Sequence, residues 1–253
     1  MGRRAGFPAR DTSRVMFEIA ELGSRLSKAD YKARVPGLRA ELLEVQQQLR
    51  QATFPVIVLF GGVDAAGRGE TVNLLNEWMD PRWITTRAWG EPSEEERERP
   101  EFWRYWRGLP PRGRIGLLLG AWYSGPLRER VGRKIGRARF DRRLARIAAL
   151  ERALADDGAV ILKFWMHLDR ESQRRRLRRL EEDPLQRWRV TRQQWRDWKR
   201  HDRIVEAAER ALRVTGTAHA PWVIVEGADE RYRAVAVATR LRNTVREALA
   251  RAA

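Results

Sequence analysis

Residues 54–71 read Phe54-Pro-Val-Ile-Val-Leu-Phe-Gly-Gly-Val-Asp-Ala-Ala-Gly-Arg-Gly-Glu-Thr71, and this stretch decides the fold. A run of β-branched and aromatic residues breaks into glycines and then opens an amphipathic segment from Thr71 to Trp78. Strand, glycine loop and helix follow in the order that a phosphate-binding loop requires. The glycines let backbone N–H groups turn toward one anion, and the helix N-terminus adds the positive end of its dipole.

The spacing of Gly62 and Gly67 matches the two glycines of the pattern G-x-x-x-x-G-K-[ST]. Two positions depart from that pattern. Arg68 stands where it has a lysine, and Gly69 stands where it has the hydroxyl that meets a metal ion. The first hydroxyl within the predicted helix is that of Thr71. We therefore expect an anion-binding loop that differs from the loop of a standard nucleoside triphosphatase.

The charge balance also favours an anionic partner. The chain has 51 Lys and Arg against 34 Asp and Glu, a net charge of +17. Such a field attracts polyanions, whether nucleic acid, anionic lipid or inorganic phosphate chains. A length of 253 residues suits one large α/β domain with a full core.

Several classes of protein are excluded or disfavoured by composition. The chain has no cysteine, so it forms no disulfide and no thiolate metal site, as suits the cytoplasm. Its longest apolar stretch, Phe54 to Val63, is about half the ~20 residues of a membrane helix. The basic N-terminus is not followed by the apolar segment of a secretory signal. We expect a soluble cytoplasmic protein without membrane contact.

The pattern along the chain alternates strands with helices. Residues 1–12 are expected to form a flexible basic arm, and 13–253 a single domain. Strands are predicted at Val56–Phe60, Trp83–Trp89, Ile115–Leu119, Val160–Leu168 and Trp222–Val225. Longer helices are predicted at Val15–Leu26, Tyr31–Leu49, Glu94–Arg107, Leu127–Ala155, Arg170–Glu182, Thr191–Val214 and Glu230–Ala250. Near-continuous apolar strands between helices indicate a five-stranded parallel sheet covered on both faces, a three-layer α/β/α fold.

Several segments together resemble the polyphosphate kinase 2 family, and most closely its duplicated polyphosphate:AMP phosphotransferase branch. The run Gly62-Val-Asp-Ala-Ala-Gly-Arg-Gly69 is similar to the family's glycine loop, G-x-D-x-x-G-K-G, so only Arg68 is unusual there. The other similar segments are residues 70–82, 92–97, 102–110, 163–168, 183–190 and 220–225. The resemblance implies a P-loop kinase fold with a helical lid at about 183–214. It implies phosphoryl transfer between inorganic polyphosphate and a nucleotide (AMP, ADP or a guanine equivalent), with Mg²⁺ as cofactor, in a homo-oligomer.

The resemblance also implies site residues by position. Asp64 would hold magnesium, and Asp64 and Arg68 would be the catalytic residues. The phosphate contacts would come from Gly62, Ala65, Ala66, Gly67, Gly69, Glu70 and Thr71. The polyphosphate chain would lie along guanidinium groups, through bidentate contacts, at Arg104, Arg174, Arg178, Arg187 and Arg189.

A second magnesium motif of the family is changed in this chain. The family's third strand ends in Asp-Arg-x-Trp-Tyr-Asn-Arg, where this chain reads Leu119-Gly-Ala-Trp-Tyr-Ser-Gly125. The Trp-Tyr pair is kept, but the aspartate is Leu119 and the arginines are Gly120 and Gly125. In the two-domain branch the amino-terminal copy is typically altered in this way, and this chain resembles that copy. Two functions stay open: a polyphosphate-dependent nucleotide phosphotransferase, and a catalytically silent polyphosphate- and nucleotide-binding member that pairs with an active subunit.

Simpler interpretations stand beside these. Asp64 also suits a turn or a helix N-cap. The arginines at 174–179 also suit a solvated helix face, paired with Glu171, Glu181 and Glu182. His167 ends an apolar strand and is expected to be a core residue rather than a ligand. A nucleic-acid-binding protein would explain the charge, but the chain has no RRM, OB or zinc-finger signature.

Overall fold

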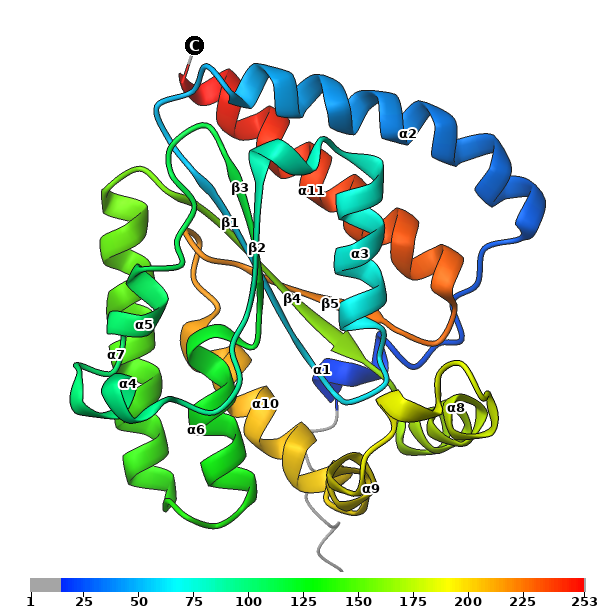
Figure 1. Ribbon diagram of the computed structural model, residues 1–253, viewed down its shortest axis with the longest axis vertical. Coiled ribbons are helices and arrows are strands. Elements are labelled where there is room, and N and C mark those ends of the chain that lie inside the picture. Colours follow the sequence, from blue (N-terminus) through cyan, green and yellow to red (C-terminus); the bar gives the residue numbers. More distant parts are fainter. Residues whose placement is uncertain (1–14, 253) are drawn as a thin grey trace, which may run out of the picture.

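The computed structural model describes residues 15–252 (Figure 1), so the predicted arm at 1–12 lies outside the described residues. Five parallel strands form one sheet in the order β2-β3-β1-β4-β5. The strands are β1 (Val56–Gly62), β2 (Ile84–Ala88), β3 (Ile115–Leu119), β4 (Val160–His167) and β5 (Trp222–Glu226). The predicted five-stranded parallel sheet is confirmed, and each predicted strand is found within two residues of its expected bounds.

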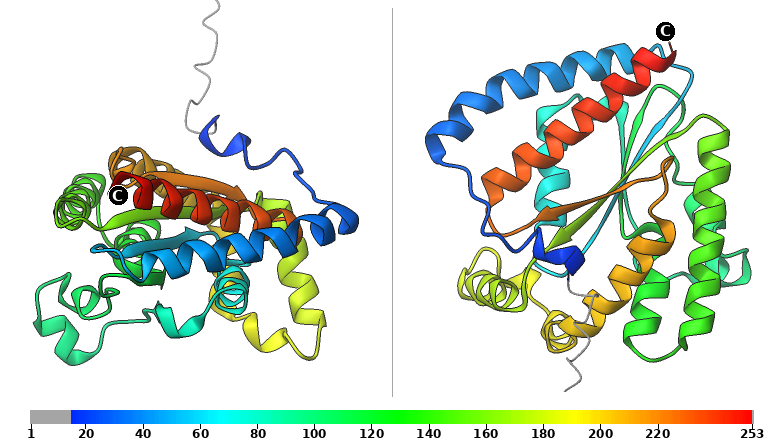
Figure 2. Two further views of the ribbon diagram at one scale, coloured as in Figure 1. Left: turned by 90° about the horizontal axis from the view of Figure 1, so that it is seen from above. Right: turned by 180° about the vertical axis from the view of Figure 1, so that it is seen from behind.

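Helices cover both faces of the sheet (Figures 1 and 2). One face carries α2 (Lys28–Leu49), α3 (Arg68–Trp78) and α11 (Glu230–Ala252), and the other carries α6 (Ala121–Val131), α7 (Arg137–Asp156) and α10 (His201–Thr215). The remaining helices are α1 (Val15–Glu18), η1 (Pro81–Trp83), α4 (Glu94–Glu98), α5 (Trp103–Trp106), α8 (Arg170–Glu182), η2 (Arg187–Arg189) and α9 (Arg192–Lys199).

The strand β1 lies in the middle of the sheet and has no exposed face. Val58 and Phe60 pack in the core beneath α2, α3 and α11, whereas Ile57 and Leu59 pack in the core beneath α6, α7 and α10. Because both sides of the strand are buried, the sequence is apolar at every position rather than at alternate ones. The strand therefore delivers the glycine loop from the centre of the molecule to the carboxyl end of the sheet.

The first predicted helix is wrong over most of its length. Val15–Leu26 is helical only in α1, over Val15–Glu18. Gly23 adopts a left-handed φ of 76°, and the amide groups of Gly23 and Ser24 each donate to the Glu226 carboxylate at 2.9 Å. The segment is thus held against the end of β5 by hydrogen bonds that a continuous helix would not allow.

Three other predicted helices are each divided in two. The segment Glu94–Arg107 contains Pro100, which disfavours helical conformation at the preceding residue. In Leu127–Ala155 the turn between α6 and α7 has Arg133 at a φ of 58°. In Thr191–Val214 the helix axis changes at Arg200, which ends α9 and precedes α10.

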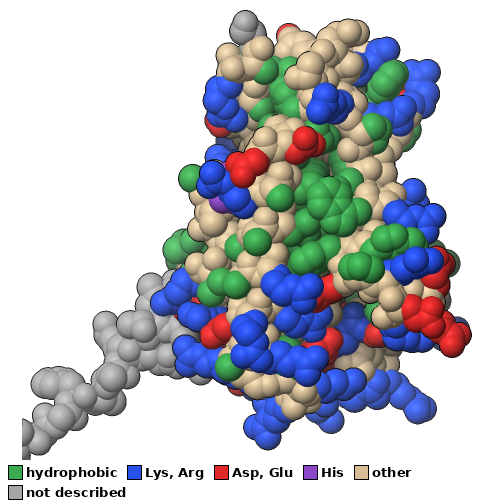
Figure 3. Space-filling model, turned by 90° about the vertical axis from the view of Figure 1, so that its left-hand side faces the viewer, with side chains coloured by type: hydrophobic (Ala, Val, Ile, Leu, Met, Phe, Trp, Pro, Cys, Tyr) green, Lys and Arg blue, Asp and Glu red, His purple; other side chains and the backbone are tan. Residues whose placement is uncertain are grey.

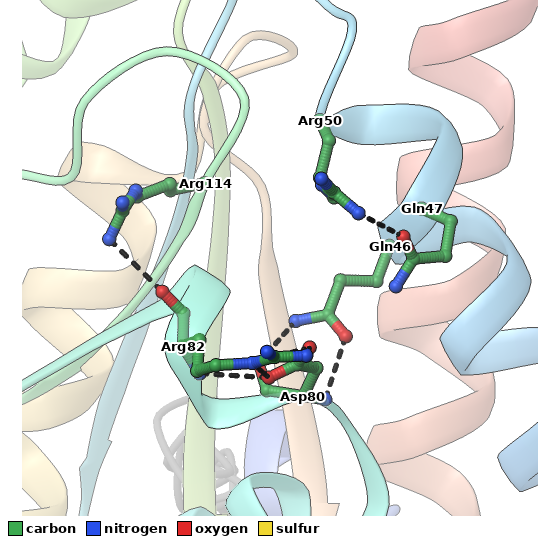
Figure 4. A network of polar contacts seen from close by, with 6 residues as sticks. All are labelled: Gln46, Gln47, Arg50, Asp80, Arg82 and Arg114. Carbon is green, nitrogen blue, oxygen red and sulfur yellow. Dashed lines mark hydrogen bonds and ion pairs between the residues drawn. The ribbon is translucent and has the colours of Figure 1, made fainter.

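The amino end of the sheet has its own group of arginines (Figure 4). The Gln46 side chain holds the backbone of Asp80 through two hydrogen bonds, of 2.9 and 2.8 Å. The Asp80 carboxylate pairs with Arg82 at 2.7 Å, and Arg114 donates to the Arg82 carbonyl oxygen at 3.1 Å. These arginines make structural contacts at the amino end of the sheet. Part of the chain's excess positive charge therefore lies far from the glycine loop.

The other basic side chains are unevenly spread. On the side of the molecule shown in Figure 3, Lys and Arg gather at the lower end, below a hydrophobic patch in the middle of the face. That lower end is the carboxyl end of the sheet in Figure 1. None of the helices in residues 15–252 combines the length and the apolar composition of a membrane-spanning segment.

Candidate functional site

The glycine loop (residues 62–69) turns sharply between β1 and α3. Gly62 has a φ of 142°, and a Cβ atom there would lie 2.3 Å from the Met166 carbonyl oxygen. Ala65 and Gly67 have left-handed φ values of 62° and 87°. Asp64 lies in a turn, as one simpler interpretation expected, but Gly67 is the N-cap of α3, so Asp64 is not the N-cap. The backbone conformation of this turn depends on its glycines.

The loop leaves a group of backbone amides without acceptors. Val63 donates to the Met166 carbonyl oxygen at 3.1 Å, and Ala66 donates to that of Val63 at 3.3 Å. For the amides of Ala65, Gly67, Arg68 and Gly69, the described part of the chain offers no hydrogen-bond acceptor. Unpaired amides at a helix N-terminus, where the dipole is positive, form an anion-binding site.

Asp64 and Arg68 lie together in this loop. Arg68 Nη2 donates to Asp64 Oδ1 at 3.1 Å. Burial raises the pKa of Asp64 above its usual value, and Asp197 adds to this rise while Arg68 opposes it. The Asp64 carbonyl oxygen accepts from Gln173 Nε2 of α8 at 3.1 Å, which ties the loop to the neighbouring helix.

Thr71 and Glu70 have contacts that the sequence did not indicate. The buried Thr71 hydroxyl donates to the Gly67 carbonyl oxygen at 2.8 Å and is engaged within the loop. Glu70 Oε1 accepts from Arg176 Nη2 at 3.1 Å and from Arg189 Nη2 at 2.5 Å. Burial favours the neutral form of Glu70, but its own backbone hydrogen bond and the two arginines outweigh burial and lower its pKa. The Glu70 side chain therefore fastens α8 and η2 to α3.

The predicted polyphosphate arginines do not form one group. Arg189 binds Glu70, next to the loop. Arg174 pairs with Glu171 instead. The side chains of Arg178 and Arg187 are exposed. The expected pairing of Glu171 with this arginine cluster is present for Arg174 and for its neighbour Arg175. The structure therefore brings only part of the predicted set to the glycine loop.

Arg104 lies at a second cavity, of about 390 Å³, on the α4–α5 side of the sheet. It pairs with Glu96 at 3.3 Å and donates to the Gly90 carbonyl oxygen at 3.3 Å. Its side chain is 9% exposed, and its Nε atom has no partner among the described residues. Ala121, Ser124 and Arg128 line both this cavity and a cavity next to the glycine loop, described below, so the two cavities adjoin.

A cavity of about 280 Å³ lies between the glycine loop and the predicted lid (residues 183–214). Asp64 and Arg68 line it from the loop, and Gln193, Asp197 and Arg200 line it from the lid. An aromatic wall is formed by Tyr123, Trp165 and Trp222. The later part of the predicted lid, α10, packs against α6 and α7.

The turn after β3 forms the third side of this cavity. Leu119 ends β3, and Gly120, with a left-handed φ of 78°, is the N-cap of α6. The next two residues enter a buried network: Trp122 Nε1 and the Tyr123 hydroxyl donate to Glu151 Oε1 at 3.0 and 2.7 Å. Lys163 Nζ donates to Glu151 Oε2 at 2.5 Å and to the Thr215 carbonyl oxygen at 2.8 Å.

Two groups of residues around the site were not found from the sequence. Gln193, Asp197 and Arg200 recur at helical spacing on one face, a signal that is present but not distinctive. Arg233 is buried beside the loop yet lies far along the chain, where no motif marks it. His167 is buried as expected, stacked on Phe17 and 2.8 Å from Glu21.

A parallel sheet covered by helices, with a glycine loop at the carboxyl end of its central strand, defines a P-loop kinase-like protein. A family model described as polyphosphate kinase 2 matches residues 25–252. The chain therefore belongs to the polyphosphate kinase 2 family.

Named relatives agree with this assignment. The chain is 48% identical over 236 residues to a polyphosphate:AMP phosphotransferase of Pseudomonas aeruginosa, covering 93% of this chain and 48% of the relative. It is 30% identical over 219 residues to NDP-polyphosphate phosphotransferase 3 of Ruegeria pomeroyi, covering 86% and 73%. The chain thus spans about half the length of the Pseudomonas relatives that it matches.

Solved structures of the family have the same fold. A polyphosphate kinase 2 structure from Pseudomonas aeruginosa PA01 aligns with a TM-score of 0.83 at 46% identity, covering 93% of this chain and 48% of that one. A polyphosphate kinase 2 structure from Arthrobacter aurescens TC1 aligns with a TM-score of 0.84 at 25% identity, covering 98% and 87%.

Proposed function

We propose that this chain binds the end of an inorganic polyphosphate in its glycine loop and transfers a phosphoryl group between polyphosphate and a nucleoside mono- or diphosphate. The observation that carries the proposal is the group of unpaired amides at Ala65, Gly67, Arg68 and Gly69, in the same loop whose Asp64 and Arg68 line the cavity. The names of the relatives, polyphosphate:AMP phosphotransferase and NDP-polyphosphate phosphotransferase, support this choice of substrates.

The residues of the site suit phosphoryl transfer. That reaction needs in-line positioning and compensation of negative charge, with little covalent chemistry from the protein. The loop amides would hold the terminal phosphate, and Arg68 would add a cation at the mouth of the loop. The nucleotide would enter the cavity beside the aromatic wall, whose rings suit a base.

Magnesium is part of the proposal, and the loop offers one carboxylate, that of Asp64, to bind it. Mg²⁺ is usually held by one or two carboxylates, with substrate phosphates and water as its other ligands. Asp64 supplies one carboxylate at the cavity, but Arg68 pairs with it. Among residues 15–252 no group of three His, Cys, Asp or Glu side chains comes together as a metal site. Asp64 would therefore hold Mg²⁺ together with the phosphates, and the ion would neutralise charge on the transferred group.

A silent member is the second candidate, and the turn after β3 favours it. At the positions where the family has an aspartate and two arginines, this chain has Leu119, Gly120 and Gly125. Within the glycine loop, Asp64 and Arg68 are the charged residues that line the cavity, and they pair with each other. In this function the chain binds polyphosphate and nucleotide while a partner subunit performs the transfer. A cytoplasmic location and a homo-oligomeric state also stay predictions.

One experiment separates these functions. The purified protein is incubated with polyphosphate, Mg²⁺ and each of AMP, ADP, GMP and GDP, and the product nucleotide is measured beside polyphosphate binding by calorimetry. Product that depends on polyphosphate supports the enzyme. Saturable binding without product supports the silent member. Absence of both binding and product would contradict the proposal.

A further inference from the structure

A buried arginine from the last helix lies against the glycine loop. Arg233 of α11 is 3% exposed and forms no salt bridge with any residue in the described range 15–252. Its Nε donates to the Thr71 hydroxyl at 3.2 Å, and its Nη1 donates to the Gly227 carbonyl oxygen at 2.7 Å. Thr71 in turn donates to the Gly67 carbonyl oxygen. The guanidinium is therefore joined to the loop through one hydroxyl.

The guanidinium also touches the loop directly. A Cβ atom added at Gly67 would lie 2.2 Å from Arg233 Cζ, so the arginine occupies the space beside the Gly67 Cα atom. A Cβ atom at Gly227 would lie 2.6 Å from the Ala66 carbonyl oxygen. The segment from Gly227 to Arg233 thus supports the residues whose amides are unpaired.

No carboxylate in the described range pairs directly with the charge of Arg233. Burial, and then the nearby Arg176, lower the pKa of Arg233 to about 10, so it stays protonated at neutral pH. Glu70, then Glu230 and Asp229, oppose this shift, but none of them forms a salt bridge with Arg233 among residues 15–252. Glu70, which opposes it most, is already bound by Arg176 and Arg189. A buried cation of this kind is costly unless an anion compensates it.

We propose that Arg233 is a positioning residue for polyphosphate: it holds the glycine loop in its anion-binding conformation, and the bound phosphate compensates its buried charge. The inference rests on the proposed function, because it requires a phosphate in the loop. It also gives this site a fixed cation close to the position where Arg68 replaces the family's lysine. If Arg233 only filled space, a neutral side chain of similar length would serve equally well.

The test compares three variants with the wild type. Arg233→Met keeps the length without the charge, and Arg233→Lys keeps the charge without the planar fork. Arg246→Met removes one charge from an exposed position about 20 Å further along α11, at 1.5 Å per residue. Binding of inorganic polyphosphate is measured by calorimetry at two salt concentrations. The melting temperature of each ligand-free protein is measured in parallel.

The expected result is a split between binding and stability. Arg233→Met should weaken polyphosphate binding about tenfold or more and reduce its salt dependence. Its ligand-free melting temperature should not fall, because an uncompensated buried charge is gone. Arg233→Lys should keep affinity within about threefold, as the charge stays, and Arg246→Met should bind like the wild type.

Other outcomes overturn the inference in distinguishable ways. If the wild type binds polyphosphate and Arg233→Met binds it equally, Arg233 has no part in binding although the proposed function stands. If Arg233→Met and Arg233→Lys lose stability and affinity together, Arg233 is a packing residue. If the wild type binds no polyphosphate, both the proposed function and this inference fail.

Discussion

Two strand–turn–helix units lie side by side at the carboxyl end of the sheet, and they share a backbone design but not a chemistry. The neighbouring strands β1 and β3 pair directly, with Leu119 at the end of β3 opposite Phe60, two residues before the end of β1. Each is followed by a helix whose N-cap is a left-handed glycine, Gly67 at a φ of 87° or Gly120 at 78°. The first turn carries unpaired amides, Asp64 and Arg68, whereas the second carries an apolar residue and glycine.

The difference shows that the backbone shape of a turn and the functional side chains on it depend on separate interactions. Below the β3 turn, Trp122, Tyr123, Glu151 and Lys163 form a buried network in which the Glu151 carboxylate accepts three donors. The hydrogen bonds of this network are made within the protein and do not involve Leu119 or Gly120, although Tyr123 also lines the cavity. The β3 turn can therefore lose its polar groups and keep its shape, and substitutions in either turn test that separation.

The largest expected effect is on stability, in Lys163→Met. Removing the cation leaves Glu151 buried without its charge partner, which should lower the free energy of unfolding by about 3–5 kcal/mol. Urea denaturation of the variant and the wild type measures this difference in the free energy of unfolding. The control Arg152→Met breaks the exposed pair with Asp156 and should cost at most about 0.5 kcal/mol. Equal stability of Lys163→Met and the wild type would mean that the network does not support the turn.

The next effect separates the two glycines. Gly67→Ala strains a left-handed residue and drives a Cβ atom to 2.2 Å from Arg233, so polyphosphate affinity should fall by about 2 kcal/mol, or about thirtyfold. Gly120→Ala carries a similar strain, with its Cβ atom 2.7 Å from Ser124 Oγ. It should lower the melting temperature and leave affinity unchanged. An equal loss of affinity in both variants would show that both turns bind the phosphate chain.

A smaller gain is expected from restoring chemistry to the second turn. Leu119→Asp with Arg68→Lys should raise turnover about tenfold, because a carboxylate and a compact ammonium return together. Gly120 is left unchanged, since its left-handed φ of 78° disfavours arginine. Each single substitution should do little, because such groups act as a unit.

The matched control for this restoration is Leu119→Asn with Arg68→Lys, which has the shape of the aspartate without its charge. Circular dichroism first establishes that both variants fold, since a polar group at a strand end costs stability. Equal turnover in the Asp and Asn variants would show that the missing carboxylate does not limit the reaction.

The smallest effect concerns Asp64 and pH. Burial, with a contribution from Asp197, raises the pKa of Asp64 in the folded protein despite the opposing Arg68. A raised pKa means that ionisation of Asp64 favours unfolding as pH rises above about 4. Asp64→Asn should therefore be more stable than the wild type at neutral pH, and the gap should close near pH 4. Lower stability of Asp64→Asn at neutral pH would instead mean that the pairing of Asp64 with Arg68 outweighs the cost of its burial.

The sequence predicts the central strands well, because β1, β3 and β4 are buried on both faces and therefore have mostly apolar sequences. It predicts the ends of helices less well. The break at Arg200 depends on how α9 and α10 pack, and the segment around Gly23 is held by Glu226, about two hundred residues away in the chain. Interactions of this range leave no local pattern.

The candidate site also divides into residues that local sequence predicts and residues that it does not. The glycines of the loop can be predicted, because their spacing and the left-handed φ values that they allow are local features. The contact of Glu70 with Arg176 and Arg189 cannot, because it joins α3 to residues of α8 and η2. Arg233 is the extreme case: its position beside Gly67 arises only when α11 packs next to α3.

The central claim is that the chain keeps the phosphate-binding turn and lacks the chemistry of the second turn. The most direct measurement is the turnover number of the wild type with saturating polyphosphate, Mg²⁺ and AMP or ADP, beside the Pseudomonas aeruginosa relative under the same conditions. Saturation removes differences in affinity, so the comparison reports the transfer step. Loss of a charged group at a phosphoryl-transfer site costs about a hundredfold or more. We predict a turnover number at least about a hundredfold below that of the relative, with polyphosphate still bound. Equal turnover numbers would contradict the account.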